Sequence, residues 1–194
     1  MNKEPHWPSV SPLTDFAFPW SSKPTPETIF RAAVSHDDKF HFRFEIEDKD
    51  IVLGHGRTVT EKVLSSDRGE LFFAADPCLT DYFCLEIDPR GYVFECHMRY
   101  YRNKADTWSW PGLEVTAQVH PGRYEITGRF PIQSLRDLDI LKSTSPTMIA
   151  GVYRAEFSRA TDGSTIEDWI SWVDPQTKNP DFHIPASFGA FELI

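Results

Sequence analysis

Alternating apolar and polar side chains dominate this sequence and predict β-strands. The clearest case is Lys39–Glu47, where phenylalanine and then isoleucine occupy every second position between charged residues and a histidine. A period of two places these apolar side chains on one face of an extended strand, so that face packs in a core while the other meets water. The segments Tyr82–Ile87 and Tyr92–Met98 flank the turn sequence Asp88–Gly91 and predict a hairpin.

Short strands separated by turn residues account for most of the remaining chain. Two short helices are predicted, one at Ile132–Leu138 after Pro131 and one, with a weaker pattern, at Thr58–Leu64. The 15 prolines and 10 glycines are spread along the whole length and punctuate many short strands. We therefore predict an all-β fold, a single antiparallel β-sandwich with one or two short helices. Further strands are predicted at residues 70–74, 113–119, 123–130, 148–157 and 190–194.

The domain organisation is simple. A chain of 194 residues suffices for one domain. It contains no internal repeat, no low-complexity tract and no clear linker. We therefore interpret residues 1–194 as one domain, with a segment rich in proline and serine at residues 1–25 that is expected to wrap over the core.

Net charge and hydropathy limit the kinds of molecule that this protein is expected to bind. The formal net charge of −9 argues against nucleic acid and against an anionic membrane surface, because both attract basic proteins. No run approaches the roughly 18 apolar residues of a membrane span. The N-terminal residues lack the apolar region of a secretory signal. We expect a soluble, cytoplasmic protein as the sequence is given, and an extracellular or periplasmic one if a signal segment was removed.

The three cysteines are Cys78, Cys84 and Cys96, and an odd number leaves at least one thiol unpaired. This favours a reducing compartment. Cys84 and Cys96 lie on either side of the predicted hairpin turn, so a disulfide across the two strands remains an alternative.

Three motifs follow one another in the last quarter of the chain. Residues 169–175 read W-I-S-W-V-D-P, residues 180–185 read P-D-F-H-I-P, and residues 188–193 read F-G-A-F-E-L. This set resembles the closing segment of the family 9 carbohydrate-binding modules and their stand-alone relatives. Further segments similar to the family occur in the same order at residues 18–24, 70–73, 82–91, 124–135 and 151–154. The resemblance implies a non-catalytic protein that binds a mono- or oligosaccharide.

The resemblance also implies a site. In sugar-binding family 9 modules, two tryptophans sandwich the ligand ring and a few polar side chains hold its hydroxyl groups. By position, Trp172 matches the C-terminal stacking tryptophan, Arg154 falls near a hydroxyl-binding position, and Glu70 matches the carboxylate on the early strand. The partner tryptophan expected shortly before that carboxylate is absent from residues 61–66.

Other tryptophans are candidates for the sugar-stacking surface. Trp169 precedes Trp172 by three positions, so on one strand the two indoles would point to opposite faces and one of them would be core. Trp108 and Trp110 lie in a sequence typical of a loop. Exposed loop tryptophans often bind ligands, so this pair would supply the second ring in place of the missing one.

Charged residues offer hydrogen bonds to hydroxyl groups. Arg99 and Arg102 follow the predicted hairpin and would grip hydroxyls or an acidic sugar as groove donors, or remain plain surface charges. Arg154 lies two residues before Glu156, so a structural ion pair between them is the alternative to hydroxyl binding by Arg154. Glu70 is flanked by apolar residues and needs a partner if it is buried.

Two alternatives to non-catalytic binding remain open. A glycoside-processing enzyme or accessory protein would use Glu70, Glu86 or Glu95, and a pair of carboxyl groups converging in one cleft would support it. A haem-binding domain of the DOMON type, which shares the sandwich fold, would need Met98 with a distant histidine as axial ligands. The sequence contains no nucleophile motif and no phosphate-binding loop.

No cofactor is predicted, and the histidine and cysteine spacings do not match a zinc site. Some family 9 modules carry structural calcium, and such an ion would need oxygen ligands of the kind found at Asp37–Asp38 or at Asp48 and Asp50. His183, in the P-D-F-H motif, is expected to be structural, with its ring bonded to a backbone carbonyl.

Overall fold

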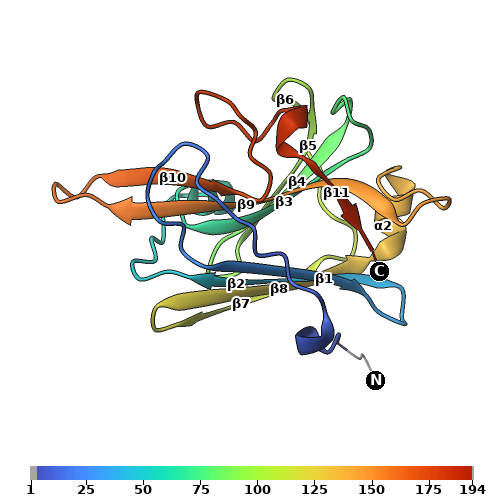
Figure 1. Cartoon of the computed structure of the whole chain (residues 1–194), viewed down its shortest axis with the longest axis horizontal. Helices are drawn as coiled ribbons and strands as arrows, with labels where there is room; N and C mark the ends of the chain where they lie inside the picture. Colours follow the sequence, from blue (N-terminus) through green and yellow to red (C-terminus); the bar gives the residue numbers. More distant parts are fainter. Residues whose placement is uncertain (1–3, 194) are drawn as a thin grey trace.

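The structure is a computed structural model that describes residues 4–193, and it contains two β-sheets stacked face to face (Figure 1). The four-stranded sheet has the order β1-β2-β8-β7, and the seven-stranded sheet has the order β10-β9-β3-β4-β5-β6, with β11 also paired to β9. The four-stranded sheet consists of β1 (Thr28–Val34), β2 (Lys39–Glu47), β7 (Glu114–His120) and β8 (Arg123–Pro131). The seven-stranded sheet consists of β3 (Arg68–Ala74), β4 (Tyr82–Ile87), β5 (Val93–Arg99), β6 (Asn103–Asp106), β9 (Thr147–Arg159), β10 (Thr165–Ser171) and β11 (Gly189–Glu192).

The predicted all-β antiparallel sandwich is confirmed, because the pairings between these strands are antiparallel. The predicted hairpin is β4–β5. The strands β1, β6 and β10 were not predicted from the sequence. β6 and β10 lie at the two edges of the seven-stranded sheet and carry several charged or polar residues, so their sequences lack an apolar period.

Both predicted helices are present and short. The helix α1 (Val59–Leu64) begins with a capping box, in which the Thr58 hydroxyl accepts from the Glu61 backbone and the Glu61 side chain accepts from Thr58. The helix α2 (Ile132–Asp137) follows β8 directly. No helix of the described residues is long and apolar enough to cross a lipid bilayer.

The main core fills the space between the sheets. On β2, the side chains of Phe40, Phe42, Phe44 and Ile46 are at most 1% exposed, and each contributes about 1.5–3 kcal/mol by leaving water. Gly128 on β8 pairs with Phe42, and a Cβ atom there would lie 2.1 Å from the Phe42 ring. The glycine therefore makes room for the phenylalanine ring in the core.

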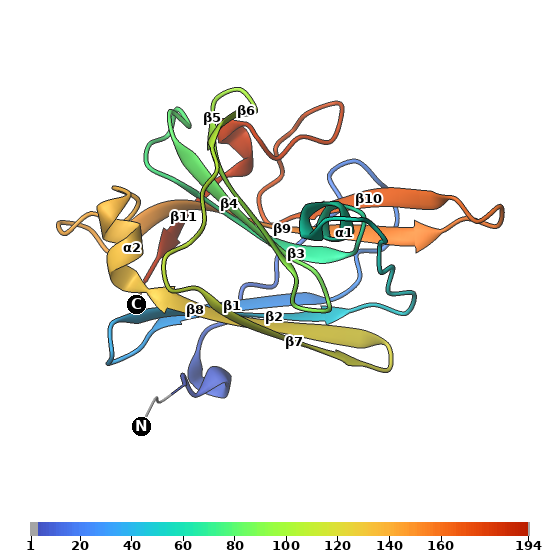
Figure 2. The ribbon, with the colours of Figure 1, turned by 180° about the vertical axis from the view of Figure 1, so that it is seen from behind.

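A second apolar cluster lies on the opposite face of the seven-stranded sheet, where residues 174–188 (the cover segment) fold over β3, β4 and β9. Phe182 of this segment stacks on Tyr153, with ring centroids 4.1 Å apart, and Phe188 packs against Phe72. β3 and β4 are consequently buried on both faces, which explains their nearly continuous apolar sequences. Figure 2 shows the same layers from behind.

The N-terminal segment joins the two sheets. Leu13 forms a bridge with Phe30 of β1, and Ala17 forms one with Ser171 of β10, so the segment crosses from one sheet to the other (Figure 1). Phe16 and Phe18 are buried in the main core. Residues 13–18 of the expected wrapping segment thus contact both sheets, and its residues 1–3 lie outside the described part of the chain.

The prediction of an exposed indole is wrong for Trp110, and Trp108 is only partly exposed. They lie in a loop, as expected, but Trp110 is only 3% exposed and Trp108 packs against the main core. The loop crosses from β6 in one sheet to β7 in the other, and its indoles fill the space between the sheets. Trp110 stacks on Phe130 with ring centroids 4.7 Å apart.

Candidate functional site

A cavity of about 490 Å³ opens on the outer face of the seven-stranded sheet, the face turned away from the four-stranded sheet. Its floor is formed by alternate residues of neighbouring strands: Glu70 of β3 pairs with Glu86 of β4, which pairs in turn with Phe94 of β5. Trp169 of β10 and the cover segment, through Phe182, form its walls. Strand register therefore brings residues from four strands to one place, and the cover segment adds a fifth segment.

Buried charges form the floor. Arg68 Nε donates to Glu86 Oε2 at 2.7 Å and lies 2.9 Å from Glu70 Oε1. Each of these three residues is at most 5% exposed. Burial, together with the neighbouring Glu86 carboxylate, raises the pKa of Glu70 to about 8. Burial also raises the pKa of Glu86. One guanidinium thus serves two carboxyl groups, and the raised pKa favours the protonated form of Glu70 at neutral pH.

The Oε1 atom of Glu70 lacks a hydrogen-bond partner among the described residues. Its distance from the Arg68 nitrogen fits an ion pair, but the N–H bond is not aligned with the oxygen. A buried polar atom without a partner is costly, and such atoms commonly receive a hydrogen bond from a ligand or a water molecule. Glu70 therefore offers free hydrogen-bonding capacity at the floor of the cavity.

Trp169 forms an aromatic wall beside this floor. The Arg68 guanidinium lies over its ring, 5.4 Å from the centroid. Phe157 and Phe182 contact the indole edge-to-face, with centroids 5.6 Å and 5.9 Å away. These contacts fix the orientation of a half-buried indole at the cavity surface. A fixed aromatic surface beside buried hydrogen-bonding groups is typical of a small-molecule site.

The rim of the cavity carries further charges. Arg102 Nη2 donates to Asp181 Oδ1 at 2.9 Å, and Lys104 forms no ion pair with a described residue. The lining contains as many cationic as acidic side chains, with Arg68, Arg102 and Lys104 opposite Glu70, Glu86 and Asp181. The lining therefore contains no excess of either charged residue type, and a proton on Glu70 would leave one positive charge in excess.

The predicted site residues separate into three groups. Glu70, Trp169 and Arg102 line the cavity. Arg99 is exposed, pairs with Asp81 at 3.0 Å and lies outside the lining. The residues that lie between the sheets instead are Arg154, Trp172, Trp108 and Trp110.

Trp172 and Trp169 point to opposite faces, as their spacing predicts. Trp172 packs against the main core and meets Phe191 edge-to-face, with centroids 6.3 Å apart. A Cβ atom on Gly189 would lie 2.7 Å from the Trp172 ring. The Trp172 indole thus contributes to core packing, and Trp169 is the one of the two tryptophans that lines the cavity.

Several lining residues were not among the predicted ones. Arg68 and Phe94 were absent from the prediction, Glu86 was considered only as a catalytic group, and Asp181 was considered only as part of a motif. For Arg68 and Glu86, the signal in the sequence is a charged residue within an otherwise apolar strand. Arg68 and Glu70 lie at alternate positions in β3, and such charges need a common partner on the same face.

His183 also differs in detail from its prediction. Its Nδ1 atom hydrogen-bonds the Tyr82 hydroxyl at 2.9 Å, where a backbone carbonyl was expected. Burial lowers the pKa of His183 to about 4. Met98, the haem-ligand candidate, lines the same cavity as His183, but the Tyr82 hydroxyl occupies the Nδ1 atom of this histidine.

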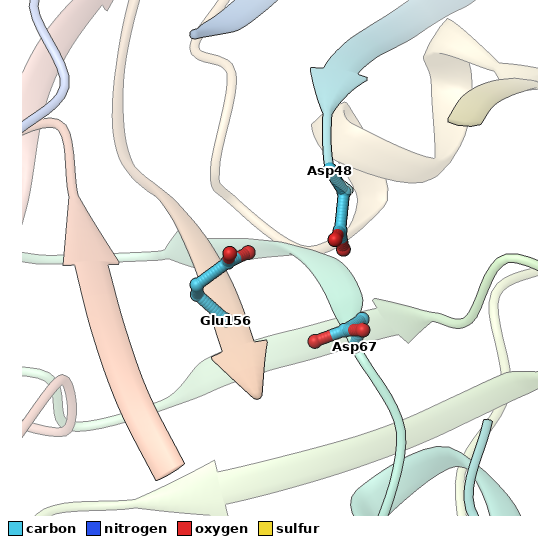
Figure 3. Close-up of side chains that lie close together, drawn as sticks. All are labelled: Asp48, Asp67 and Glu156. Atoms are coloured by element: carbon cyan, nitrogen blue, oxygen red, sulfur yellow. The ribbon is translucent and has the colours of Figure 1, made fainter. Parts of the chain in front are cut away.

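A second group of carboxylates lies between the sheets. Asp48, Asp67 and Glu156 point toward one another, and their nearest oxygens lie within 4.8 Å (Figure 3). Both Asp67 oxygens accept backbone N–H groups, one from Val52 and one from Phe157 at 2.6 Å. Arg154 donates to Glu156 and lies 3.7 Å from Asp48 Oδ2. The cluster therefore connects segments of both sheets.

Calcium does not fit this cluster well. The ion takes about six to eight oxygen ligands, whereas both Asp67 oxygens already accept backbone hydrogen bonds. The Arg154 guanidinium also brings a positive charge against Glu156. Burial raises the pKa of Asp67 to about 8 and that of Glu156 to about 7. Arg154 and bound protons thus compensate the negative charge, and the cluster is structural.

These raised pKa values predict a pH-dependent stability. Asp67, Glu70 and Glu156 have ordinary pKa values near 4 and folded values of about 7 to 8. Between about pH 4 and about pH 8, the folded protein therefore holds more protons than the unfolded chain. The resulting stabilisation is present at low pH and is lost as the pH rises through about 8.

We expect a higher melting temperature at pH 6 than at pH 9, measured by thermal unfolding at constant ionic strength. The Asp67→Asn variant should show a shallower dependence, because one of the titrating groups is removed. A melting temperature that rises from pH 6 to pH 9 would contradict this assignment.

The protein is a two-sheet β-sandwich with a cavity on the outer face of its larger sheet. The chain belongs to the family described as "Carbohydrate family 9 binding domain-like", whose model matches residues 2–194. The sequence resemblance is therefore confirmed. None of the curated proteins matches this sequence.

Solved structures support the same fold. A candidate carbohydrate-binding protein from Bacteroides uniformis superposes with a TM-score of 0.71 at 16% identity, covering 97% of this chain and 88% of that one. A family 9 carbohydrate-binding module from Caldicellulosiruptor kristjanssonii in complex with glucose gives 0.64 at 12% identity, covering 100% and 88%. A family 9 module from the same organism in complex with cellotriose gives 0.63 at 13% identity, covering 96% and 84%.

Proposed function

We propose that this protein binds a neutral saccharide in the cavity on the outer face of the seven-stranded sheet and catalyses no reaction on it. The observation that carries the proposal is the Oε1 atom of Glu70, which is buried beside the Trp169 wall and accepts no hydrogen bond from a described residue. An indole accepts the apolar C–H face of a pyranose, and the buried carboxyl group then selects its hydroxyls. Family membership and the saccharide ligands of the similar modules support the same function.

The polar floor suits hydroxyl recognition. A protonated Glu70 both donates and accepts a hydrogen bond, and Arg68 supplies further donors beside it. A sugar hydroxyl also donates and accepts, so it satisfies both groups at once. The glucose and cellotriose ligands of the similar modules favour a neutral sugar over an acidic one.

The glycosidase alternative draws support from one observation, because Glu70 and Glu86 do converge in one cavity. The two groups nevertheless share Arg68 and lie side by side on the floor. Glycosidases place their carboxyl groups on opposite sides of the scissile bond. Two groups on the same side of the ligand, held by one guanidinium, favour binding over hydrolysis.

A glycan-array screen of the purified protein, followed by calorimetric titration, tests the proposal. We expect binding to neutral glycans and no turnover of aryl-glycosides. The Glu70→Gln variant should bind about 2- to 10-fold more weakly, because its amide oxygen faces Arg68 and leaves only a donor for the ligand, and a hydrogen bond between neutral groups contributes about 0.5–1.5 kcal/mol.

Glu95→Gln is a matched control. Glu95 does not line the cavity, and its Oε1 atom accepts the Trp110 backbone N–H at 2.7 Å. This variant should keep the affinity of the wild-type protein. The proposal would be overturned by an array without any bound glycan, or by hydrolysis that disappears in Glu70→Gln.

A further inference from the structure

Two exposed tyrosines stand at the turn between β5 and β6, next to the cavity. Tyr100 is 52% exposed and Tyr101 is 47% exposed, although the ring of each is large and mostly apolar. Their rings meet edge-to-face, with centroids 5.5 Å apart. We call this pair the tyrosine platform. Adjacent exposed aromatic rings beside a ligand cavity are a feature that commonly serves binding.

The platform is connected directly to the rim of the cavity. The Tyr101 hydroxyl donates to Asp181 Oδ2 at 2.6 Å, and Arg102 donates to the other oxygen of the same carboxylate. Asp181 and Arg102 both line the cavity. The Arg102 guanidinium also lies 5.6 Å from the Tyr101 ring centroid. A ligand that leaves the cavity on this side therefore meets the platform next.

The platform is held in a fixed position although it is exposed. The Tyr100 backbone N–H donates to the Leu79 carbonyl at 3.0 Å, which joins the turn to the loop before β4. Burial opposes ionisation of Asp181, yet the hydrogen bonds that it accepts hold its pKa below the ordinary value. Arg102 adopts a left-handed backbone with φ of 56°, which is uncommon outside glycine. A fixed aromatic surface loses little conformational entropy when a ligand stacks on it.

We propose that the tyrosine platform is a second sugar subsite, so that the ligand is an oligosaccharide whose first ring fills the cavity and whose next ring stacks on Tyr101. The inference rests on the proposed saccharide binding in the cavity. Arg102 and Asp181 would hold hydroxyl groups at the junction between the two rings, because they lie at both the cavity rim and the platform.

The experiment compares a monosaccharide with a trisaccharide. Calorimetric titrations with glucose and cellotriose, and with xylose and xylotriose, give two matched ratios of affinity. We expect the wild-type protein to bind the trisaccharide of at least one series about 5- to 100-fold more tightly than its monosaccharide, the scale of one aromatic contact. Tyr101→Ala should remove most of that gain and leave the monosaccharide affinity unchanged.

Two variants separate stacking from other effects. Tyr101→Phe keeps the ring and loses the bond to Asp181, so it should retain most of the gain. Val119→Ala changes an exposed side chain on the other sheet and should retain all of it. The melting temperatures of the variants should stay within about 2 °C of the wild type, since these side chains are exposed.

The possible failures are distinguishable. Equal affinity for monosaccharide and trisaccharide, or a gain that survives Tyr101→Ala, would overturn the second subsite and leave the cavity site intact. A loss of monosaccharide and trisaccharide affinity by the same factor in Tyr101→Ala would also overturn it, since the turn would then only shape the cavity. No binding of any of the four sugars would overturn the cavity site and the subsite together.

Discussion

Replacing Arg154 by alanine is expected to destabilise the protein by about 3–5 kcal/mol, because it leaves buried acidic groups without their charged partner. Arg154 is fully buried and ties three segments together. It donates to Thr28 Oγ1 at 3.2 Å and to the Glu47 carbonyl at 2.9 Å, and it pairs with Glu156 on its own strand. Chemical denaturation of the wild-type protein and the variant measures the difference.

The same change should not alter saccharide affinity in the folded fraction. Arg154 lies between the sheets and does not line the cavity on the outer face. Arg159→Ala is the matched control, because Arg159 lies on the same strand with an exposed side chain. We expect it to change the free energy of unfolding by less than about 0.5 kcal/mol. A stable Arg154→Ala protein that has lost its ligand would show that Arg154 binds hydroxyl groups after all.

Replacing Trp169 by alanine is expected to weaken saccharide binding by about 2 kcal/mol or more, which corresponds to about 30-fold in the dissociation constant. The variant loses the aromatic wall of the cavity and the surface over which the Arg68 guanidinium lies. Trp169→Phe should lose less, because it retains a ring. Calorimetric titration with cellotriose, or with the glycan that the array identifies, measures these losses.

Trp172→Ala provides the contrast. Its indole packs against the main core and Gly189, so its removal should cost about 3 kcal/mol of stability, the lower end for a tryptophan because the ring is only half-buried. Affinity in the folded fraction should be unchanged. Loss of affinity in Trp172→Ala but not in Trp169→Ala would reverse the assignment of the two tryptophans.

Most strands could be predicted because their apolar period is local. Lys39–Glu47 alternates so regularly that its buried face follows directly from the sequence, and the turn at Asp88–Gly91 contains its own glycine at positive φ. β6 escaped prediction because it is a short edge strand with the polar sequence N-K-A-D, which only its neighbour β5 holds in place.

The site was harder to predict because it depends on register between strands far apart in the sequence. Glu70 and Trp169 were predicted individually, but only the pairing of both β3 and β10 with β9 brings them into one cavity. Trp108 and Trp110 have a loop sequence, which says nothing of whether the loop crosses open surface or closes the core. Arg154 lies near an expected functional position, but its side chain points to the inner face of β9. There it forms ion pairs with Asp48 and Glu156.

The most direct test of the cavity site is a titration of the tryptophan indole signals by nuclear magnetic resonance. The chain contains 6 tryptophans, and each indole N–H gives one cross-peak that a single Trp→Phe variant assigns. As saccharide is added, we expect the largest shift at Trp169, because it alone of Trp169, Trp172, Trp108 and Trp110 lines the cavity. The signals of the other three should stay nearly constant. The largest shift at Trp172, Trp108 or Trp110, with Trp169 unmoved, would contradict the cavity site.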